Sequence, residues 1–216
     1  MQISFEKIYA IFFFREKNRE GVICPVCSSF ERHRFFWFLM KEKTDLLNSQ
    51  KQKKMLHIAP EKCFTEIFSN LSHIDYLSAD LNSPEAMEKI DITDINYPDE
   101  SFDVIYSSHV LEHVPDDKKA LTEFYRVLKP GGWMLLSIPI NENLEVTDAD
   151  LELDDPQERI RRFGNVDHMR VYGIDFEDKL EISGFNFEKY YPADFVSQKL
   201  IKKCNLPSQP VYICKK

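Results

Sequence analysis

The sequence predicts an α/β fold with a doubly wound, mostly parallel sheet, because apolar strand patterns alternate with helical patterns along most of the chain. Buried strands are expected over residues 55–59, 74–79, 102–107 and 133–138, with a short strand over 90–92. Two last strands, 185–191 and 211–214, have no clear helical crossover between them. Strands joined without a crossover helix are antiparallel, so we expect these two to form a closing hairpin.

Helix signals separate the strands. Ser28 and Glu31 form a capping-box pattern ahead of an apolar face, and Pro60 stands at a plausible helix start. A later helix must stop at Lys129-Pro130-Gly131-Gly132, and Gly184 breaks the last one. Helices are therefore expected over residues 30–47, 60–70, 115–128, 157–162 and 175–183.

Length and charge restrict the function. A chain of 216 residues fits one domain, expected over 51–216, with an N-terminal appendage over 1–50. The net charge of -8 gives no general attraction for phosphate backbones or anionic membranes, so a nucleic-acid partner is disfavoured. The apolar run 8–14 is too short to span a bilayer. Five cysteines do not suggest a disulfide framework, so a cytoplasmic location is expected.

The first cysteine pair, Cys24 and Cys27, has the CxxC spacing of a zinc knuckle. A structural zinc site needs four ligands, and a second pair is not evident. Either half of a zinc ribbon or a metal-free turn fits this pattern. We favour the metal-free turn and predict no metal ligands.

Polar side chains follow the strand over 102–107. Ser108, His109, Glu112 and His113 come just past its end. In an open parallel sheet the carboxyl ends of the strands line the ligand crevice. These side chains are therefore candidates for a site.

Three motifs carry a family resemblance. They are Ser101-Phe102-Asp103-Val104-Ile105, His109-Val110-Leu111-Glu112-His113-Val114 and Arg126-Val127-Leu128-Lys129-Pro130-Gly131-Gly132. In this order they resemble the class I S-adenosylmethionine-dependent methyltransferases, in particular the small-molecule group, and the N-terminus resembles a subset with a zinc-ribbon-like start. The resemblance implies a Rossmann-like, seven-stranded sheet with an antiparallel last strand. It also implies S-adenosylmethionine as cofactor, S-adenosylhomocysteine as product and a small-molecule acceptor.

The resemblance also implies site residues. Asp80 matches the acceptor for the ribose hydroxyls, because a carboxylate offers acceptors only. Asp91 matches the residue beside the adenine amino group, and Ser108 and His109 match the floor between cofactor and acceptor. The expected cofactor contacts are Ala59, Pro60, Glu61, Asp80, Leu81, Asp91, Ile92 and Ser108.

The first loop departs from the family pattern. The family places an acidic residue and three glycines there, whereas this chain has His57, Ala59, Glu61 and Cys63. We expect Ala59 to permit a close approach and Glu61 to bind the methionine ammonium in place of the missing acid. The alternative is a decayed cofactor site in a catalytically silent protein.

Two histidines are the candidate catalytic bases. His109 is expected at the reacting centre, and His168 in a loop that often builds the acceptor pocket in this fold. A structural histidine is the competing reading of each. His109 to His113 also spells H-x-x-E-H, but a zinc protease needs one continuous helix there, and Pro115 starts a new one.

Four arginines lie near the same loop. Arg159, Arg161, Arg162 and Arg170 could clamp an anionic acceptor, but we favour pairing with the acidic run 148–155.

The family resemblance therefore implies a methyltransferase that acts on a small molecule. The alternatives are a ribosomal-RNA methyltransferase and a non-catalytic, cofactor-binding scaffold of the same fold.

Overall fold

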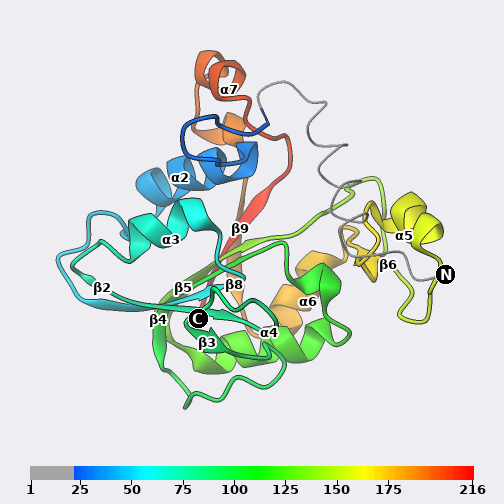
Figure 1. Ribbon diagram of the computed structural model, residues 1–216, viewed down its shortest axis with the longest axis horizontal. Coiled ribbons are helices and arrows are strands. Elements are labelled where there is room, and N and C mark those ends of the chain that lie inside the picture. The colour runs from blue at the N-terminus through cyan, green and yellow to red at the C-terminus, as the bar shows by residue number, and fades with distance from the viewer. Residues whose placement is uncertain (1–21) are drawn as a thin grey trace.

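The computed structural model describes residues 22–216, and its centre is a seven-stranded sheet with the order β3-β2-β1-β4-β5-β9-β8 (Figure 1). The strands are β1 (Lys53–Ile58), β2 (Ile74–Asp80), β3 (Glu88–Lys89), β4 (Phe102–Ser108), β5 (Leu128–Ser137), β8 (Asn186–Tyr190) and β9 (Val211–Lys215). Two further strands, β6 (Asp148–Ala149) and β7 (Arg170–Val171), form a separate small sheet.

The pairing confirms the predicted fold class. β1 is parallel to β2 and β4, β2 is parallel to β3, and β4 is parallel to β5. β9 is antiparallel to both β5 and β8, so the last strand runs against the rest of the sheet. The strand order reverses between β1 and β4, and a crevice opens at such a switch point beyond the carboxyl ends of the strands.

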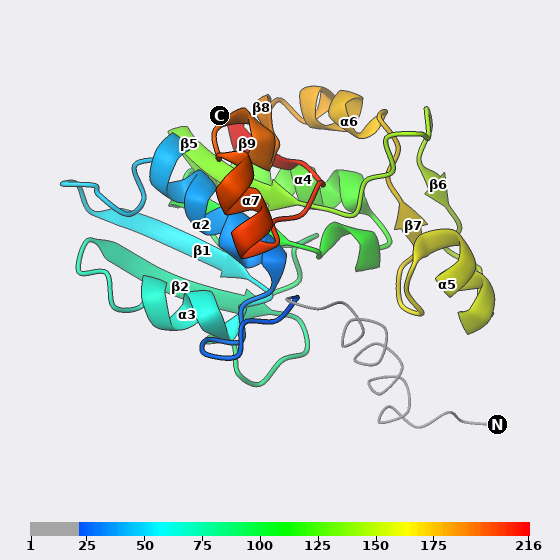
Figure 2. The same ribbon diagram turned by 90° about the horizontal axis from the view of Figure 1, so that it is seen from above.

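Helices cover both faces of the sheet. In Figures 1 and 2, α2 (Glu31–Lys43), α3 (Lys62–Phe68) and α7 (Gln198–Cys204) lie on one side, and α4 (Asp117–Val127) and α6 (Phe176–Ile182) lie on the other. Each face buries its own apolar core. Leu56 and Ile58 pack toward α4 and α6, whereas Met55 packs toward α2 and α3. The period of two along β1 sends alternate side chains into the two cores.

The N-terminal appendage shares a core with the sheet. Phe35, Phe36 and Leu39 of α2 are fully buried and belong to the same cluster as Val104 of β4 and Trp133 of β5. The boundary predicted near residue 50 stays a prediction.

The apolar run 8–14 lies outside the described residues. Among residues 22–216, no helix is long and apolar enough to cross a membrane.

Several predicted element bounds were wrong. α2 ends at Lys43 and begins after Phe30, whose N–H donates to Nδ1 of His33, while Ser28 has a φ of 58° and is not the cap. The third strand is Glu88–Lys89 and not 90–92, because the chain turns away after pairing with β2. β5 begins already at Leu128, which pairs with Phe102 before a bulge at the glycines.

Other elements were not foreseen. The connection between β8 and β9 contains α7 and the short 3₁₀ helix η2 (Pro192–Asp194). The 3₁₀ helix η1 (Leu111–His113) follows β4. By contrast, α5 (Pro156–Phe163), between the two strands of the small sheet, was predicted over residues 157–162. The two 3₁₀ helices have three residues each, which leaves too short a pattern to read from the sequence.

Candidate functional site

A cleft of about 730 Å³ opens at the carboxyl ends of β1, β2 and β4. It is bounded by the loops after these strands, by the 90–93 turn and by the loop before β7. Its lining includes Ile58, Ala59, Asp80, Leu81, Asn82, Ile90, Asp91, Ile92, Thr93, His109, Val110, His113, Val114, Pro115, Asp116, Arg159, Asp167 and Met169. Of the expected cofactor contacts, Ala59, Asp80, Leu81, Asp91 and Ile92 line this cleft together, whereas Pro60, Glu61 and Ser108 are not part of its lining.

Two non-glycine residues in the cleft wall have a left-handed backbone. Ala59, directly after β1, has a φ of 48°, and His109, directly after β4, has a φ of 55°. Such conformations are sterically unfavourable for residues with a Cβ and persist where the surrounding structure enforces them. Ala59 thus adopts the kind of backbone that glycine usually supplies.

The Glu61 carboxylate lies among histidines. Its Oε1 is 3.2 Å from Nε2 of His33, and its Oε2 is 3.3 Å from Nε2 of His57. Burial alone would raise the pKa of Glu61, but the hydrogen bonds to the two imidazoles outweigh it and hold this pKa well below its usual range. Nδ1 of His57 continues the network to the Tyr76 hydroxyl. Glu61 therefore connects α2 to the first loop, and its role as an ammonium ligand stays a prediction.

Two aspartates face the cleft from neighbouring strand ends. Oδ1 of Asp80 accepts hydrogen bonds from the N–H groups of Asn82 and Ser83. Among the described residues no partner is found for its Oδ2. Oδ1 of Asp91 accepts from the N–H and hydroxyl of Thr93, and these bonds lower the Asp91 pKa. Each aspartate thus shapes its own turn and keeps a carboxylate edge at the cleft.

His109 lies where two clefts meet. A second cleft of about 680 Å³ is lined by His109, by Arg32 and Phe36 of α2, by Ser137, and by the 205–211 segment. The His109 side chain is 34% exposed, and its Nδ1 is 3.1 Å from Oε1 of Glu112. Ser108 is buried, and its hydroxyl has no partner in the described part of the chain.

His168 lies near the same oxygen of Glu112 as His109. Its Nε2 is 3.9 Å from Oε1 of Glu112, and its Nδ1 is 2.9 Å from the carbonyl of Phe163. Burial lowers the pKa of the His168 imidazole. This side chain is mostly buried and is not part of the lining of either cleft. Of the two candidate bases, His109 is the one at the cleft surface.

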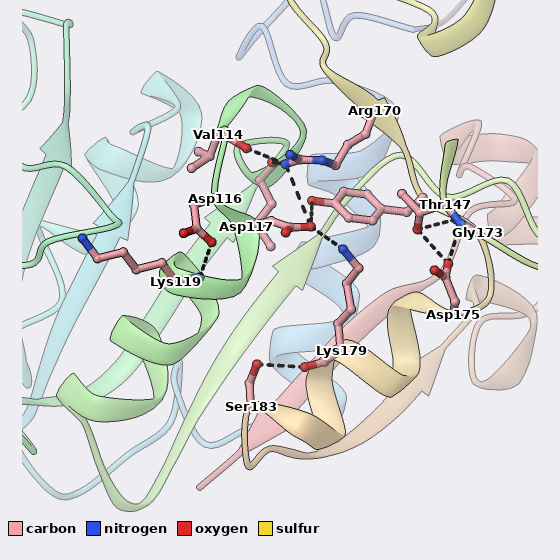
Figure 3. Close-up of polar contacts among 12 residues, drawn as sticks. Val114, Asp116, Asp117, Lys119, Thr147, Arg170, Gly173, Asp175, Lys179 and Ser183 are labelled. Carbon is pink, nitrogen blue, oxygen red and sulfur yellow. Dashed lines mark hydrogen bonds and ion pairs between the residues drawn. The ribbon is translucent and has the colours of Figure 1, made fainter. Parts of the chain in front are cut away.

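Arg170, the first residue of β7, ties this strand to the segment after β4 (Figure 3). Its guanidinium donates to the carbonyls of Leu111, Val114 and Pro115. Asp117 lies beside it and accepts from Lys179 at 2.8 Å and from the Tyr172 hydroxyl at 3.2 Å. Arg170 is 3% exposed, so it is neither a surface partner of the acidic run nor open to an acceptor.

The other arginines have different roles. Arg162 pairs with Asp148 and Asp150, as the sequence predicts for this group, whereas Arg161 pairs with Glu158. Arg159 donates to the carbonyl of Leu153 and lines the first cleft. A basic side chain therefore does reach the cleft, but it comes from one arginine and not from a clamp of four.

The comparisons with known proteins agree with this geometry. Residues 52–136 match a family model described as a methyltransferase domain. The matched stretch runs from the start of β1 almost to the end of β5 and contains the Asp80, Asp91 and His109 positions. The 27-O-demethylrifamycin SV methyltransferase of Amycolatopsis mediterranei is 31% identical over 118 residues, which cover 50% of this chain and 42% of that enzyme. This chain thus spans less than half the length of that relative.

Solved structures share the fold. A SAM-dependent methyltransferase from Archaeoglobus fulgidus has a TM-score of 0.57 and 16% identity, covering 96% of this chain and 99% of that one. Phosphoethanolamine N-methyltransferase 2 of Haemonchus contortus, in complex with S-adenosylhomocysteine, has a TM-score of 0.54 and 14% identity, covering 85% and 52%. At these identities the likeness shows a shared fold.

Proposed function

We propose that this chain is an S-adenosylmethionine-dependent methyltransferase that acts on a small-molecule acceptor. The proposal rests on one observation: five residues that the sequence predicts as cofactor contacts line one cleft although they come from separate parts of the chain. They are Ala59, Asp80, Leu81, Asp91 and Ile92. The match of residues 52–136 to a methyltransferase domain supports the same conclusion.

In this proposal the cofactor lies across the ends of β1 and β2. Oδ2 of Asp80 accepts hydrogen bonds from the ribose, and the Ile92 side chain provides an apolar wall for the adenine beside Asp91. The left-handed backbone at Ala59 supports a close approach of the first loop, because it turns the chain as a glycine would. The positively charged sulfonium then faces the end of β4.

The second cleft is the proposed acceptor site, and His109 stands between it and the cofactor cleft. Methyl transfer is a displacement that depends on holding the nucleophile in line with the methyl group. His109 would contact the acceptor there and take its proton where the acceptor carries one. A small-molecule acceptor fits the size of this cleft and the acidic net charge of -8.

Calorimetry tests the cofactor site. S-adenosylmethionine and S-adenosylhomocysteine should bind the wild-type chain, and Asp80→Asn should weaken binding by roughly 10- to 100-fold, as expected for lost hydrogen bonds to a charged group. Asp75→Asn is the matched control, because Asp75 is exposed near the amino end of the same strand. Absence of binding to either ligand would contradict the proposal and favour a non-catalytic protein of this fold.

Methyl transfer tests the reacting end. With labelled S-adenosylmethionine and a panel of small acceptors, His109→Ala should abolish turnover while the cofactor affinity changes little. If His109→Ala turns over normally, the proposed role of His109 is wrong. If label enters RNA and not small acceptors, the alternative of an RNA methyltransferase holds.

A further inference from the structure

Three potential metal ligands converge beside the reacting end of the cleft. Glu112 and His113 belong to η1, and His168 comes from the loop before β7. One ligand atom from each of them lies within 4.8 Å of the others. The His113 and His168 rings meet edge to face with centroids 4.8 Å apart. Ligands of one ion lie about 2.0–2.2 Å from it, so only a small closure would bring all three into one coordination sphere.

Glu112 is the unusual member of this group. Its side chain is fully buried, and among the described residues its Oε2 has no hydrogen-bond partner. Its other oxygen is 3.1 Å from Nδ1 of His109. Burying a carboxylate with an unpaired oxygen is costly, and such groups normally hold a partner, a water or an ion.

The two histidines are oriented as metal ligands usually are. Nδ1 of His168 is 2.9 Å from the carbonyl of Phe163, and Nδ1 of His113 is 3.3 Å from the carbonyl of Asp167. In each ring one nitrogen is thus fixed by a backbone carbonyl, and Nε2 remains for a further partner. A hydrogen bond of this kind sets the tautomer and orientation of metal-binding histidines.

The surrounding structure fixes the two ligand segments against each other. The Met169 N–H donates to the carbonyl of Glu112 at 2.9 Å, and Arg170 donates to the carbonyls of Leu111 and Val114 on either side. Figure 3 shows the contact of Arg170 with Val114. Met169 and Arg170, which follow His168, are thus anchored to η1, and this anchoring holds His168 toward Glu112. Rigid support of this kind is what a preorganised site needs.

We propose that Glu112, His113 and His168 bind one divalent transition-metal ion in the wall of the cofactor cleft. Two imidazoles and one carboxylate suit zinc or a neighbouring transition metal better than magnesium or calcium, which prefer oxygen ligands. Because His113 lines the cleft, an ion held there would keep open positions toward the ligand side. An acceptor oxygen could occupy one of them. Binding of the ion does not depend on the proposed methyl transfer. Coordination of an acceptor oxygen by the ion rests on that proposed function.

Zinc titration of the full chain tests the site. Cys24→Ser and Cys27→Ser are introduced first, so that this thiol pair does not compete for the ion. Calorimetry after chelator treatment should then give one zinc per chain. Glu112→Gln and His168→Gln should each weaken binding by more than about 10-fold. The matched control is His73→Gln, because His73 lies at the amino end of β2 and its Nε2 bonds the carbonyl of Leu46.

His113→Gln provides a second test in case substitution of the buried Glu112 prevents folding. Its side chain is 33% exposed, so the change should weaken zinc binding and leave the thermal unfolding of the metal-free chain nearly unchanged. Absence of a zinc site in the parent chain, or equal affinity in all these variants, would overturn the proposal. Titration of S-adenosylhomocysteine into the same variants without zinc reports separately on the cofactor site.

Discussion

Oε2 of Glu61 lies 3.3 Å from Nε2 of His57, and the same carboxylate reaches His33 of α2 through its other oxygen. The hydrogen bonds to these imidazoles hold the Glu61 pKa below its ordinary value of 4.5, despite burial. A depressed carboxyl pKa contributes stability that is present above the unfolded pKa and is lost as the pH falls. We therefore expect the free energy of unfolding to decrease as the pH drops below about 4.5.

Substitution of Glu61 isolates this contribution. Glu61→Gln should lower the free energy of unfolding at pH 7 by about 2 kcal/mol, because it removes the charge from a mostly buried network. Below the ordinary carboxyl pKa the variant should lose less stability than the wild type. Urea denaturation at several pH values measures both effects. Glu66→Gln changes an exposed carboxylate of α3, the helix that Glu61 precedes, and is the control. Parallel pH curves for wild type and Glu61→Gln would contradict the expectation.

The backbone at Ala59 gives a second prediction. Ala59→Gly relieves a left-handed strain of about 1–2 kcal/mol and costs about 0.5–1 kcal/mol in chain entropy, so stability should stay equal or rise slightly. Ala59→Val should destabilise by about 2 kcal/mol, because a β-branched residue tolerates this backbone less well. Ala86→Gly is the control, since Ala86 has no positive φ. The midpoint of thermal unfolding of each variant measures these changes. A lower midpoint for Ala59→Gly than for the wild type would contradict backbone strain at this position.

Arg170 should matter for stability more than a surface arginine. Arg170→Ala removes the guanidinium that donates to the carbonyls of Leu111, Val114 and Pro115 and should cost about 3 kcal/mol or more. Arg170→Lys should rescue only part of this, because an ammonium lacks the planar fork. Arg161→Ala, at an exposed pair with Glu158, should have no measurable effect. Urea denaturation compares the three, and equal midpoints would refute the anchoring role.

The cysteines should differ in reactivity. Backbone N–H groups of Cys27 and Val26 lower the pKa of the Cys24 thiol, whereas burial raises the pKa of Cys63 to about 12. Burial also raises the pKa of Cys214, which is fully buried. Because the thiolate is the reactive form, alkylation of the reduced chain near neutral pH should modify Cys24 before Cys63 and Cys214. Peptide mass spectrometry gives the order, and unfolding in urea should abolish the difference.

The sheet could be read from the sequence because its strands are long, apolar and separated by strong helix and turn signals. Asp80 and His109 could be placed at the cleft for the same reason, since Asp80 ends β2 and His109 comes directly after β4. The motif around Arg126 has a second, structural meaning that pattern alone does not reveal. Its guanidinium donates to the carbonyls of Ile95 and Tyr97 and thereby holds the turn before β4.

The long-range partners could not be predicted. Glu61 meets His33 across 28 residues, and Arg170 meets Leu111 across 59 residues. No local period encodes such contacts, because they depend on how the helices and loops pack on the sheet. The convergence of His168 with Glu112 and His113 was missed for the same reason. The H-x-x-E-H spacing was the available signal, but it was interpreted only as a zinc-protease motif, which needs a continuous helix.

Arg170 also has a consequence for the order in which the chain folds during synthesis. The stretch that matches a methyltransferase domain ends at residue 136, and Arg170 follows more than thirty residues later. A ribosome-bound chain that has emerged only through β5 holds the first five strands of the main sheet, but the carbonyls of Leu111, Val114 and Pro115 still lack the Arg170 guanidinium. The wall that carries His109 and Glu112 is therefore completed by a later part of the nascent chain than the one that provides Asp80 and Asp91.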